Sequence, residues 1–164
     1  EALLLHGESS RLHRLLVEES GVCLDVSGGW QGHQFDPSLF TVDCTVRDGR
    51  TPEEAEALVY GELARLGAEG PGERELRKVK NGLKAAFVRR LRTIDGKASL
   101  ISETDTFFGG WRNLNARIAA IEAVTAADVK AVIAKRFTAT NRTVCTLPPA
   151  AVGPDEASDE GDVR

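Results

Sequence analysis

The stretch that decides the fold is SSRLHRLLVEESGVCLDVSGGW, residues 9–30, where a helical pattern gives way to a strand pattern. Ser9 or Ser10 can cap a helix by accepting a hydrogen bond from a free backbone N–H group. One apolar stripe at helical spacing follows, formed by Leu12, Leu15 and Leu16. Gly21 suits the left-handed residue that commonly ends a helix. The stretch therefore predicts a short helix that leads directly into a strand.

Two strand patterns follow, separated by the turn-rich sequence GHQFDPS at residues 32–38. In the first pattern, Val22, Leu24 and Val26 alternate with Cys23, Asp25 and Ser27. In the second pattern, the residues of one face are Phe40, Val42, Cys44 and Val46. Alternation of this kind is typical of strands with one buried face, so we predict an antiparallel hairpin that buries the apolar set.

From Thr51 the apolar period becomes helical. Thr51 can cap the helix, Pro52 suits its first position, and Glu54 completes a capping box. The expected buried stripe is Ala55, Leu58, Val59, Leu63 and Leu66. The sequence GAEGPGE then breaks this helix.

Further helical patterns fill most of the remaining chain. The ranges expected to be helical are 72–92, 97–108 after a break at Gly96, 111–123, and 125–137. Thr125 and Asp128 form a second capping box. The sequence NRTVCTL, residues 141–147, predicts a last strand that ends at two prolines.

The order of helix, two strands, several helices and one strand indicates an α+β fold, with helices on one face of a mostly antiparallel sheet. Residues 1–150 are expected to form one domain, and the acidic segment 151–164 is expected to be disordered. Three strands are few for so many helices, and the chain starts at Glu1 without any methionine. We therefore expect an N-terminally truncated domain that lacks one or two strands.

The composition argues against several classes of function and of structural site. A net charge of -4 argues against nucleic acid as a partner. No apolar run approaches the roughly 20 residues that a membrane span requires. Three cysteines without a C-x-x-C pair argue against a disulfide framework or a structural zinc site.

A zinc site is the first chemical hypothesis for residues 5–30. His6 and His13 lie seven positions apart, and Glu18 or Glu19 would have to serve as a third ligand. Zinc sites usually have tighter spacings, such as H-x-x-x-H or H-x-x-E-H, and neither occurs in this chain. We therefore predict a solvated helix face at these residues and no metal ligand.

The sequence also gives no indication of a serine or cysteine nucleophile. There is no G-x-S-x-G motif, and Cys44 and Cys145 occur in strand patterns where small apolar residues belong. Cys23 alternates toward the opposite, more exposed face. The aromatic motif FFGGW, residues 107–111, is expected to pack between helices. No catalytic and no cofactor-binding residue is predicted.

The order of the motifs SSRL, TPEEAEA, VTAADVKAVIAKRF and NRTV resembles the pitrilysin (insulinase) family of zinc metallopeptidases. The resemblance extends from about Leu4 to Pro149 and is closest to the second, non-catalytic half of bacterial members related to mitochondrial processing peptidase. It implies two similar α+β halves that enclose an extended peptide. The zinc ion belongs to the first half, which carries H-x-x-E-H.

In many family members this helix and strand carry an arginine and a tyrosine that help stabilise the tetrahedral intermediate. Those positions correspond here to Val17 and Leu24. Neither side chain can donate a hydrogen bond to a developing oxyanion. The resemblance therefore implies a half without catalytic residues, whose missing pair is supplied by a partner subunit.

The resemblance predicts a non-catalytic C-terminal domain of a zinc-dependent endopeptidase that processes unstructured peptides. Its expected partners are the catalytic half of the same chain, a homologous subunit in a homo- or heterodimer, and the peptide substrate. The compartment stays open between bacterial periplasm and cytoplasm. Two alternatives remain: a catalytically dead scaffold subunit, and a module that binds peptides along a strand edge.

Overall fold

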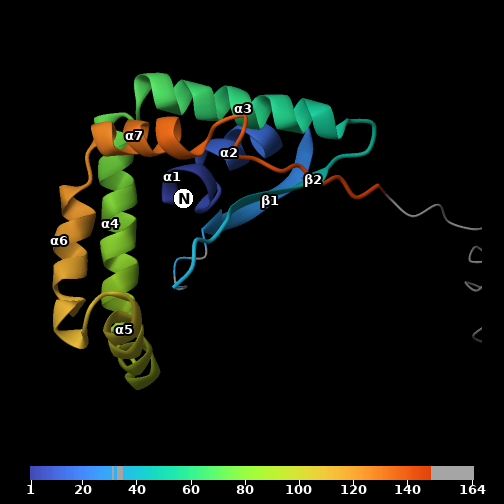
Figure 1. Ribbon diagram of the computed structural model, residues 1–164. Helices are drawn as coiled ribbons and strands as arrows, with labels where there is room; N and C mark the ends of the chain where they lie inside the picture. The colour runs from blue at the N-terminus through green and yellow to red at the C-terminus, as the bar shows by residue number, and fades with distance from the viewer. Residues whose placement is uncertain (31, 33–34, 149–164) are drawn as a thin grey trace, which may run out of the picture.

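The computed structural model describes residues 1–30, 32 and 35–148. The segment 151–164, which was predicted to be disordered, lies outside the described residues. Figure 1 shows two regions, which we call the body and the arm. The body contains α1, α2, η1, the β1–β2 hairpin, α3 and α7, and the arm contains α4, α5, η2 and α6.

The elements confirm the α+β class that the sequence predicts. Along the chain they are α1 (Ala2–Leu5), α2 (Arg11–His13), η1 (Arg14–Glu19), β1 (Cys23–Trp30), β2 (Phe40–Val46), α3 (Pro52–Glu69), α4 (Glu73–Arg90), α5 (Ile94–Phe107), η2 (Trp111–Leu114), α6 (Ala116–Ala123) and α7 (Ala126–Arg136). Strands β1 and β2 pair antiparallel, as expected. Among the described residues, no helix is long and apolar enough to cross a membrane.

The start of the hairpin differs from its predicted register. Cys23 pairs with Val46 and Asp25 pairs with Thr45, so Leu24 is an extra residue in a bulge. A bulge reverses the alternation of faces on one side of it. Leu24 is therefore 53% exposed, whereas Cys23 is fully buried. The predictions that Leu24 faces inward and Cys23 outward were both wrong.

The body holds the main hydrophobic core. Its buried members are Leu4, Leu12, Leu16, Val22, Cys23, Val26, Ala55, Val59, Leu63, Leu66 and Ile133. Helix α3 starts with the predicted capping box, in which the Glu54 N–H donates to Thr51 Oγ1 at 3.3 Å and the Thr51 N–H donates to Glu54 Oε2 at 3.1 Å. Helix α7 has the second predicted capping box and lies beside α3.

The arm buries far fewer side chains than the body. Only Phe87, Leu100 and Thr104 are buried among its described residues. Helix α5 begins at Ile94, before the break predicted at Gly96, because the Thr93 hydroxyl accepts the Gly96 N–H at 3.0 Å and caps the helix. A Cβ at residue 96 would lie 2.0 Å from the Arg90 carbonyl oxygen, so glycine permits this close approach inside the first turn.

The predicted helix 111–123 is divided into two elements. Gly109 and Gly110 have positive φ angles and form the predicted turn. The Asn113 amide then donates to the carbonyl oxygens of Phe108 and Gly109, at 2.8 and 3.2 Å. These bonds hold residues 111–114 against the turn as the short helix η2, and α6 starts only at Ala116.

The strand predicted at residues 141–147 is not formed, and this prediction was wrong. Residues 142–148 have no regular secondary structure in the described chain. The Arg142 guanidinium lies over the Tyr60 ring, 4.2 Å from its centroid, so the segment passes along α3. An alternating pattern becomes a strand only when a neighbouring strand offers backbone hydrogen bonds, and none of the described strands does so here.

Candidate functional site at the corner between helix and strand

The corner between η1 and β1 contains the two positions that the sequence comparison singled out. Helix η1 is a π-helix, in which the Ser20 N–H donates to the Leu15 carbonyl oxygen five residues earlier, at 3.0 Å. Such wide turns are rare and often occur at functional sites. Gly21 then has a φ of 60°, which allows the chain to leave the helix and enter β1.

Val17 belongs to η1 and Leu24 belongs to β1, and the two side chains have different surroundings. Val17 is partly buried and packs against the core from η1. Leu24 is mostly exposed on the bulge of β1. Both side chains are apolar, so neither can stabilise a negative charge by hydrogen bonding.

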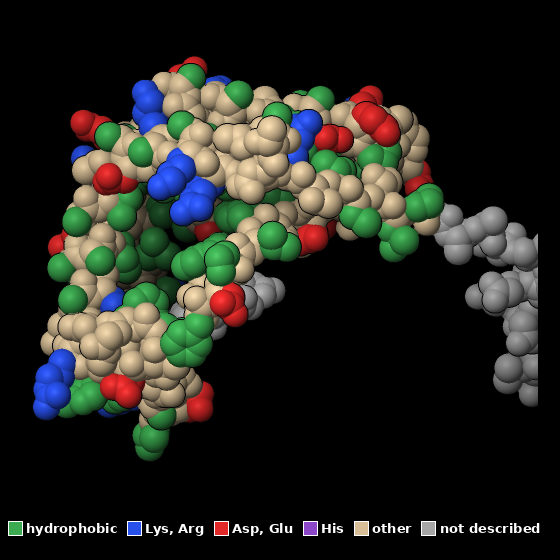
Figure 2. All heavy atoms as spheres, viewed as in Figure 1, with side chains coloured by type: hydrophobic (Ala, Val, Ile, Leu, Met, Phe, Trp, Pro, Cys, Tyr) green, Lys and Arg blue, Asp and Glu red, His purple; other side chains and the backbone are tan. Residues whose placement is uncertain are grey.

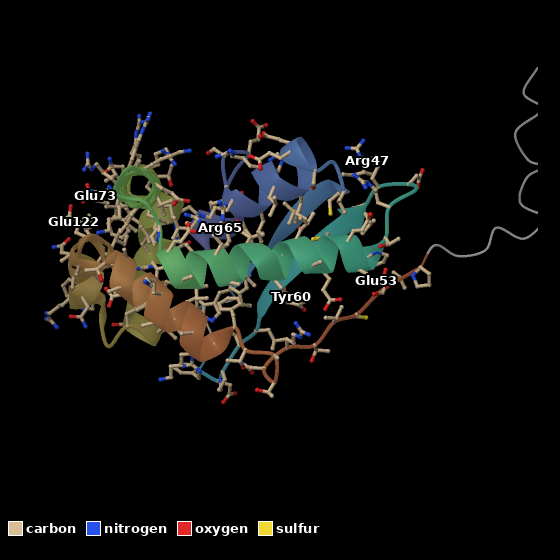
Figure 3. All side chains as sticks on the ribbon, turned by 90° about the horizontal axis from the view of Figure 1, so that it is seen from above. Arg47, Glu53, Tyr60, Arg65, Glu73 and Glu122 are labelled. Carbon is tan, nitrogen blue, oxygen red and sulfur yellow. The ribbon has the colours of Figure 1, made fainter. Side chains whose placement is uncertain are left out.

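Two arginines that follow the hairpin donate hydrogen bonds to backbone carbonyl groups at the same corner. Arg47 Nε donates to the Gly21 carbonyl oxygen at 3.1 Å, and an Arg50 amino group donates to the Ser20 carbonyl oxygen at 3.0 Å. Figure 3 shows Arg47 beside the loop that follows β2. A positive charge at a helix C-terminus interacts favourably with the unpaired carbonyl groups there. These contacts position the corner.

The cysteines near the corner are poorly suited to nucleophilic chemistry. All three cysteines are free thiols. Burial raises the pKa of the Cys23 thiol, and burial together with the neighbouring Cys23 raises the pKa of Cys44 to about 12. The reactive form of cysteine is the thiolate, which a raised pKa disfavours.

The histidines considered as zinc ligands have separate partners. His6 Nδ1 lies 3.8 Å from a Glu1 carboxylate oxygen. His13 Nδ1 lies 3.0 Å from the Glu8 carbonyl oxygen and 3.8 Å from a Glu18 carboxylate oxygen. Glu19 pairs instead with Arg14, at 2.7 Å. The structure does not bring the two histidines to a common site, and no group of three or more potential metal ligands occurs within residues 1–30, 32 and 35–148.

A charged cluster between the body and the arm was missed by the sequence analysis. Arg11 donates to Glu62 at 2.8 Å and makes two bonds to Glu75, at 2.7 and 2.6 Å. Arg65 also donates to Glu62, at 2.9 and 2.6 Å. Glu62 is only 3% exposed. The signal in the sequence was a glutamate placed within the apolar stripe of a predicted helix.

The ion pairs of this cluster connect three helices. Arg11 starts α2, Glu62 and Arg65 belong to α3, and Glu75 belongs to the first turn of α4. In Figure 3, Arg65 lies on the side of α3 that faces the N-terminal helices. The hydrogen bonds from Arg11 lower the pKa of the Glu75 carboxyl, and the same bonds raise the pKa of Arg11. Both groups are therefore held in their charged forms.

A shallow, open pocket of about 400 Å³ lies on the arm. The Glu103 carboxylate lies at this pocket and contacts Arg90 at 3.0 Å and Arg117 at 3.7 Å. Phe107, from the predicted aromatic motif, packs against Phe35 of the segment between the strands, with ring centroids 5.1 Å apart. Phe35 lies in a loop and is 83% exposed, and Trp111 is 50% exposed, so this contact is not the packing between helices that was predicted for the motif.

Comparison with known protein families identifies a match over half of the chain. The model of the Peptidase M16 inactive domain matches residues 1–83, which include the corner, the hairpin, α3 and the first part of α4. No curated protein matches the chain.

Solved structures share the fold over most of the chain. A protease from Helicobacter pylori matches with a TM-score of 0.77 and 22% identity, over 85% of this chain and 33% of its own. The inactive peptidase domain of a proposed zinc protease from Bordetella parapertussis matches with a TM-score of 0.74 and 20% identity, over 87% of this chain and 76% of its own. A proposed zinc protease from Bordetella pertussis Tohama I matches with a TM-score of 0.73 and 20% identity, over 87% and 77%. The chain thus spans about one third of the Helicobacter protease.

Proposed function

Because the chain belongs to the Peptidase M16 inactive domain family, we propose that it is the non-catalytic half of a zinc-dependent endopeptidase. The family match over residues 1–83 supports this assignment. The similarity of fold to an inactive peptidase domain agrees with it. In this proposal, the chain forms one wall of a chamber that receives unstructured peptides, and the catalytic half forms the opposite wall.

The donor set of residues 1–30, 32 and 35–148 does not fit a catalytic zinc ion. Zinc in such enzymes needs three protein ligands that converge on one point. The chain has no H-x-x-E-H motif, and its His6 and His13 side chains have different partners. We therefore assign the zinc ion and the water that it activates to the catalytic half, and no catalytic residue to this one.

The observation that carries the proposal is the apolar pair Val17 and Leu24 at the corner. A valine and a leucine cannot donate hydrogen bonds to the oxyanion of a tetrahedral intermediate. We propose that a homologous partner subunit supplies the arginine and the tyrosine, and that this half shapes the chamber. A complete enzyme would then require both subunits.

The test is peptide cleavage by the full-length polypeptide, with and without its partner subunit. We expect little cleavage alone, and a gain in kcat of about 100-fold or more when a partner is added. Leu24→Tyr on the exposed bulge should raise the activity of the isolated subunit, especially together with Val17→Arg. Leu24→Phe is the matched control because it adds the ring without the hydroxyl group.

Full activity of the unmodified subunit without a partner would contradict the proposal of supply in trans. Equal effects of Leu24→Tyr and Leu24→Phe would contradict the role assigned to the hydroxyl group. Circular dichroism of each variant separates a loss of folding from a change in chemistry.

The second candidate function is a catalytically inactive scaffold or peptide-binding subunit of the same family. The apolar pair at the corner is also compatible with this function, because a catalytically inactive subunit does not require either hydrogen-bond donor. Elemental analysis of the full-length polypeptide separates the two. About one zinc ion per chain, lost when an H-x-x-E-H motif elsewhere in the polypeptide is mutated, supports the peptidase; no bound zinc supports the scaffold.

A further inference from the structure

The turn that joins α4 to α5 lies at the end of the arm away from the body (Figure 1). We call residues 88–101, which include this turn, the arm tip. It exposes three branched apolar side chains: Val88 is 52% exposed, Ile94 is 89% exposed and Ile101 is 44% exposed. Removing such surface from water is favourable. The described part of the chain therefore leaves apolar surface of the arm tip available for a contact.

Positive charge is concentrated at the same place. The arm tip contains Arg89, Arg90, Arg92 and Lys97 and a single acid, Asp95, which gives it a net charge of +3. The rest of the chain has 17 basic and 24 acidic residues, a net charge of -7. The arm tip is thus a basic region on an acidic chain, and it should attract an anionic surface.

Three of the four cations at the arm tip are free to bind such a surface. Arg90 is occupied, because its guanidinium contacts the Glu103 carboxylate at 3.0 Å. Within residues 1–30, 32 and 35–148, the side chains of Arg89, Arg92 and Lys97 have no hydrogen bond, ion pair or aromatic contact, and all three residues are exposed.

The apolar and basic side chains of the arm tip lie next to one another. Ile94, Lys97 and Ile101 are spaced by three and four residues, so they share one side of α5. Val88 and Arg92 have the same spacing at the end of α4. Figure 2 shows Lys and Arg side chains beside hydrophobic ones at this end of the arm. Long basic side chains can bind headgroups while neighbouring apolar side chains enter the layer beneath.

We propose that the arm tip binds the surface of a membrane that contains anionic phospholipids. Val88, Ile94 and Ile101 enter the boundary between headgroups and acyl chains, and the three free cations bind anionic headgroups. This inference is independent of the proposed function, because a scaffold subunit could bind a membrane in the same way.

The mixed character of the arm tip favours a lipid surface over other partners. A protein interface needs a continuous, closely packed apolar centre, whereas these apolar side chains are separated by cations. Exposed ion pairs with an acidic protein would add little affinity. A nucleic acid would bind the cations and leave the isoleucines in water. A bilayer accepts single apolar side chains without matching their shape, and each basic residue near an anionic bilayer strengthens binding by about 5-fold.

Cosedimentation of the full-length polypeptide with lipid vesicles tests the proposal. We expect binding to vesicles of equal parts phosphatidylserine and phosphatidylcholine, and little binding to pure phosphatidylcholine. Added salt should weaken the binding because it screens the charges. Arg89→Gln together with Arg92→Gln should weaken it by about 30-fold, since two cations are lost. Ile94→Ser should weaken it by about 5-fold or more.

The matched control is Arg74→Gln together with Arg77→Gln. This variant removes the same charge from exposed positions of the same helix. Arg77 lies about 18 Å from Arg89 along the helix axis. The Debye length is about 10 Å at an ionic strength of about 0.1 M, so the control should change binding by less than about 2-fold. Circular dichroism of both double variants checks that each is folded.

Surface labelling gives a second measurement. In an Ile94→Cys variant with Cys145→Ser, a water-soluble maleimide should react quickly with residue 94, and anionic vesicles should slow the reaction. Slow labelling without vesicles would overturn the proposal, because another part of the polypeptide would then cover the arm tip.

The vesicle experiment can also contradict the proposal. No binding to anionic vesicles, or equal binding to both kinds of vesicle, would overturn it. Equal weakening by the two double variants would show attraction by overall charge and no role for the arm tip. A concentration-dependent dimer that Ile94→Ser abolishes would assign the arm tip to a second copy of the chain.

Discussion

The body and the arm are made from helices of similar length, yet they differ in how much they bury. Helix α3 of the body buries five side chains along 18 residues, whereas α4 of the arm, also 18 residues long, buries one. Because most helical stability comes from tertiary packing of an apolar face, the arm depends more on local signals than the body does. Its caps, its ion pairs to Glu103 and its aromatic contacts must contribute a larger share.

The comparison predicts a large effect for a body leucine and a small one for an arm leucine. Leu12 is completely buried, so Leu12→Ala should lower the free energy of unfolding by about 2–5 kcal/mol. Leu83→Ala removes the same atoms from a position that is 37% exposed and should cost less than about 1 kcal/mol. Urea denaturation of both variants measures the difference, and equal losses would contradict the division into body and arm.

The charged cluster that joins the body to the arm should give the next largest effect. Glu62→Gln leaves two arginines facing a neutral side chain in a buried position, and we expect a loss of about 2 kcal/mol. Glu53→Gln, an exposed change on the same helix, is the matched control and should cost less than about 0.5 kcal/mol. Similar midpoints of thermal unfolding for the two variants would show that the cluster adds little to stability.

The Glu75 carboxyl makes part of this stabilisation depend on pH. Its pKa is lower in the folded protein than its ordinary value of 4.5, because Arg11 donates hydrogen bonds to its charged form. The contribution is therefore present above pH 4.5 and is lost as the pH falls through the lowered pKa. We expect Glu75→Gln to flatten the acid side of the stability curve as the pH falls below 4.5. An unchanged slope would contradict this role.

The smallest expected effects come from the helix caps. Thr51→Ala and Thr93→Ala each remove one capping acceptor, with an expected cost of about 1 kcal/mol. The loss at Thr51 should lower the stability of the whole domain, since α3 packs on the main core. The loss at Thr93 should mainly accelerate amide exchange within α5. Global destabilisation by both variants to the same extent would show that the arm unfolds together with the body.

Local signals predicted most elements because each signal depends on nearby residues alone. The capping boxes at Thr51 and Thr125 predicted the starts of α3 and α7, and the alternating pattern predicted the β1–β2 hairpin. The start of α5 was placed too late because Gly96 resembles a break. Its real function is to let the helix approach the Arg90 carbonyl group, which depends on packing.

The positions of the candidate site were proposed from the sequence, but their geometry could not be predicted from it. Val17 and Leu24 were identified by their positions relative to family motifs, and both lie at one corner of the fold. The exposure of Leu24 depends on a bulge, which arises from the pairing of two strands and has no signature at that position. The same bulge decides that Cys23 is buried.

The sequence by itself determined the capping boxes, the hairpin and most of the helices, and it contains no zinc-binding motif, because these features depend on residues close together in the chain. Only the tertiary structure decided the partners of Arg11, the face taken by Leu24 and the path of residues 142–148. Glu62 and Glu75 lie 51 and 64 positions from Arg11. A contact over such a separation depends on how the helices pack, and a strand forms only where another strand offers its edge.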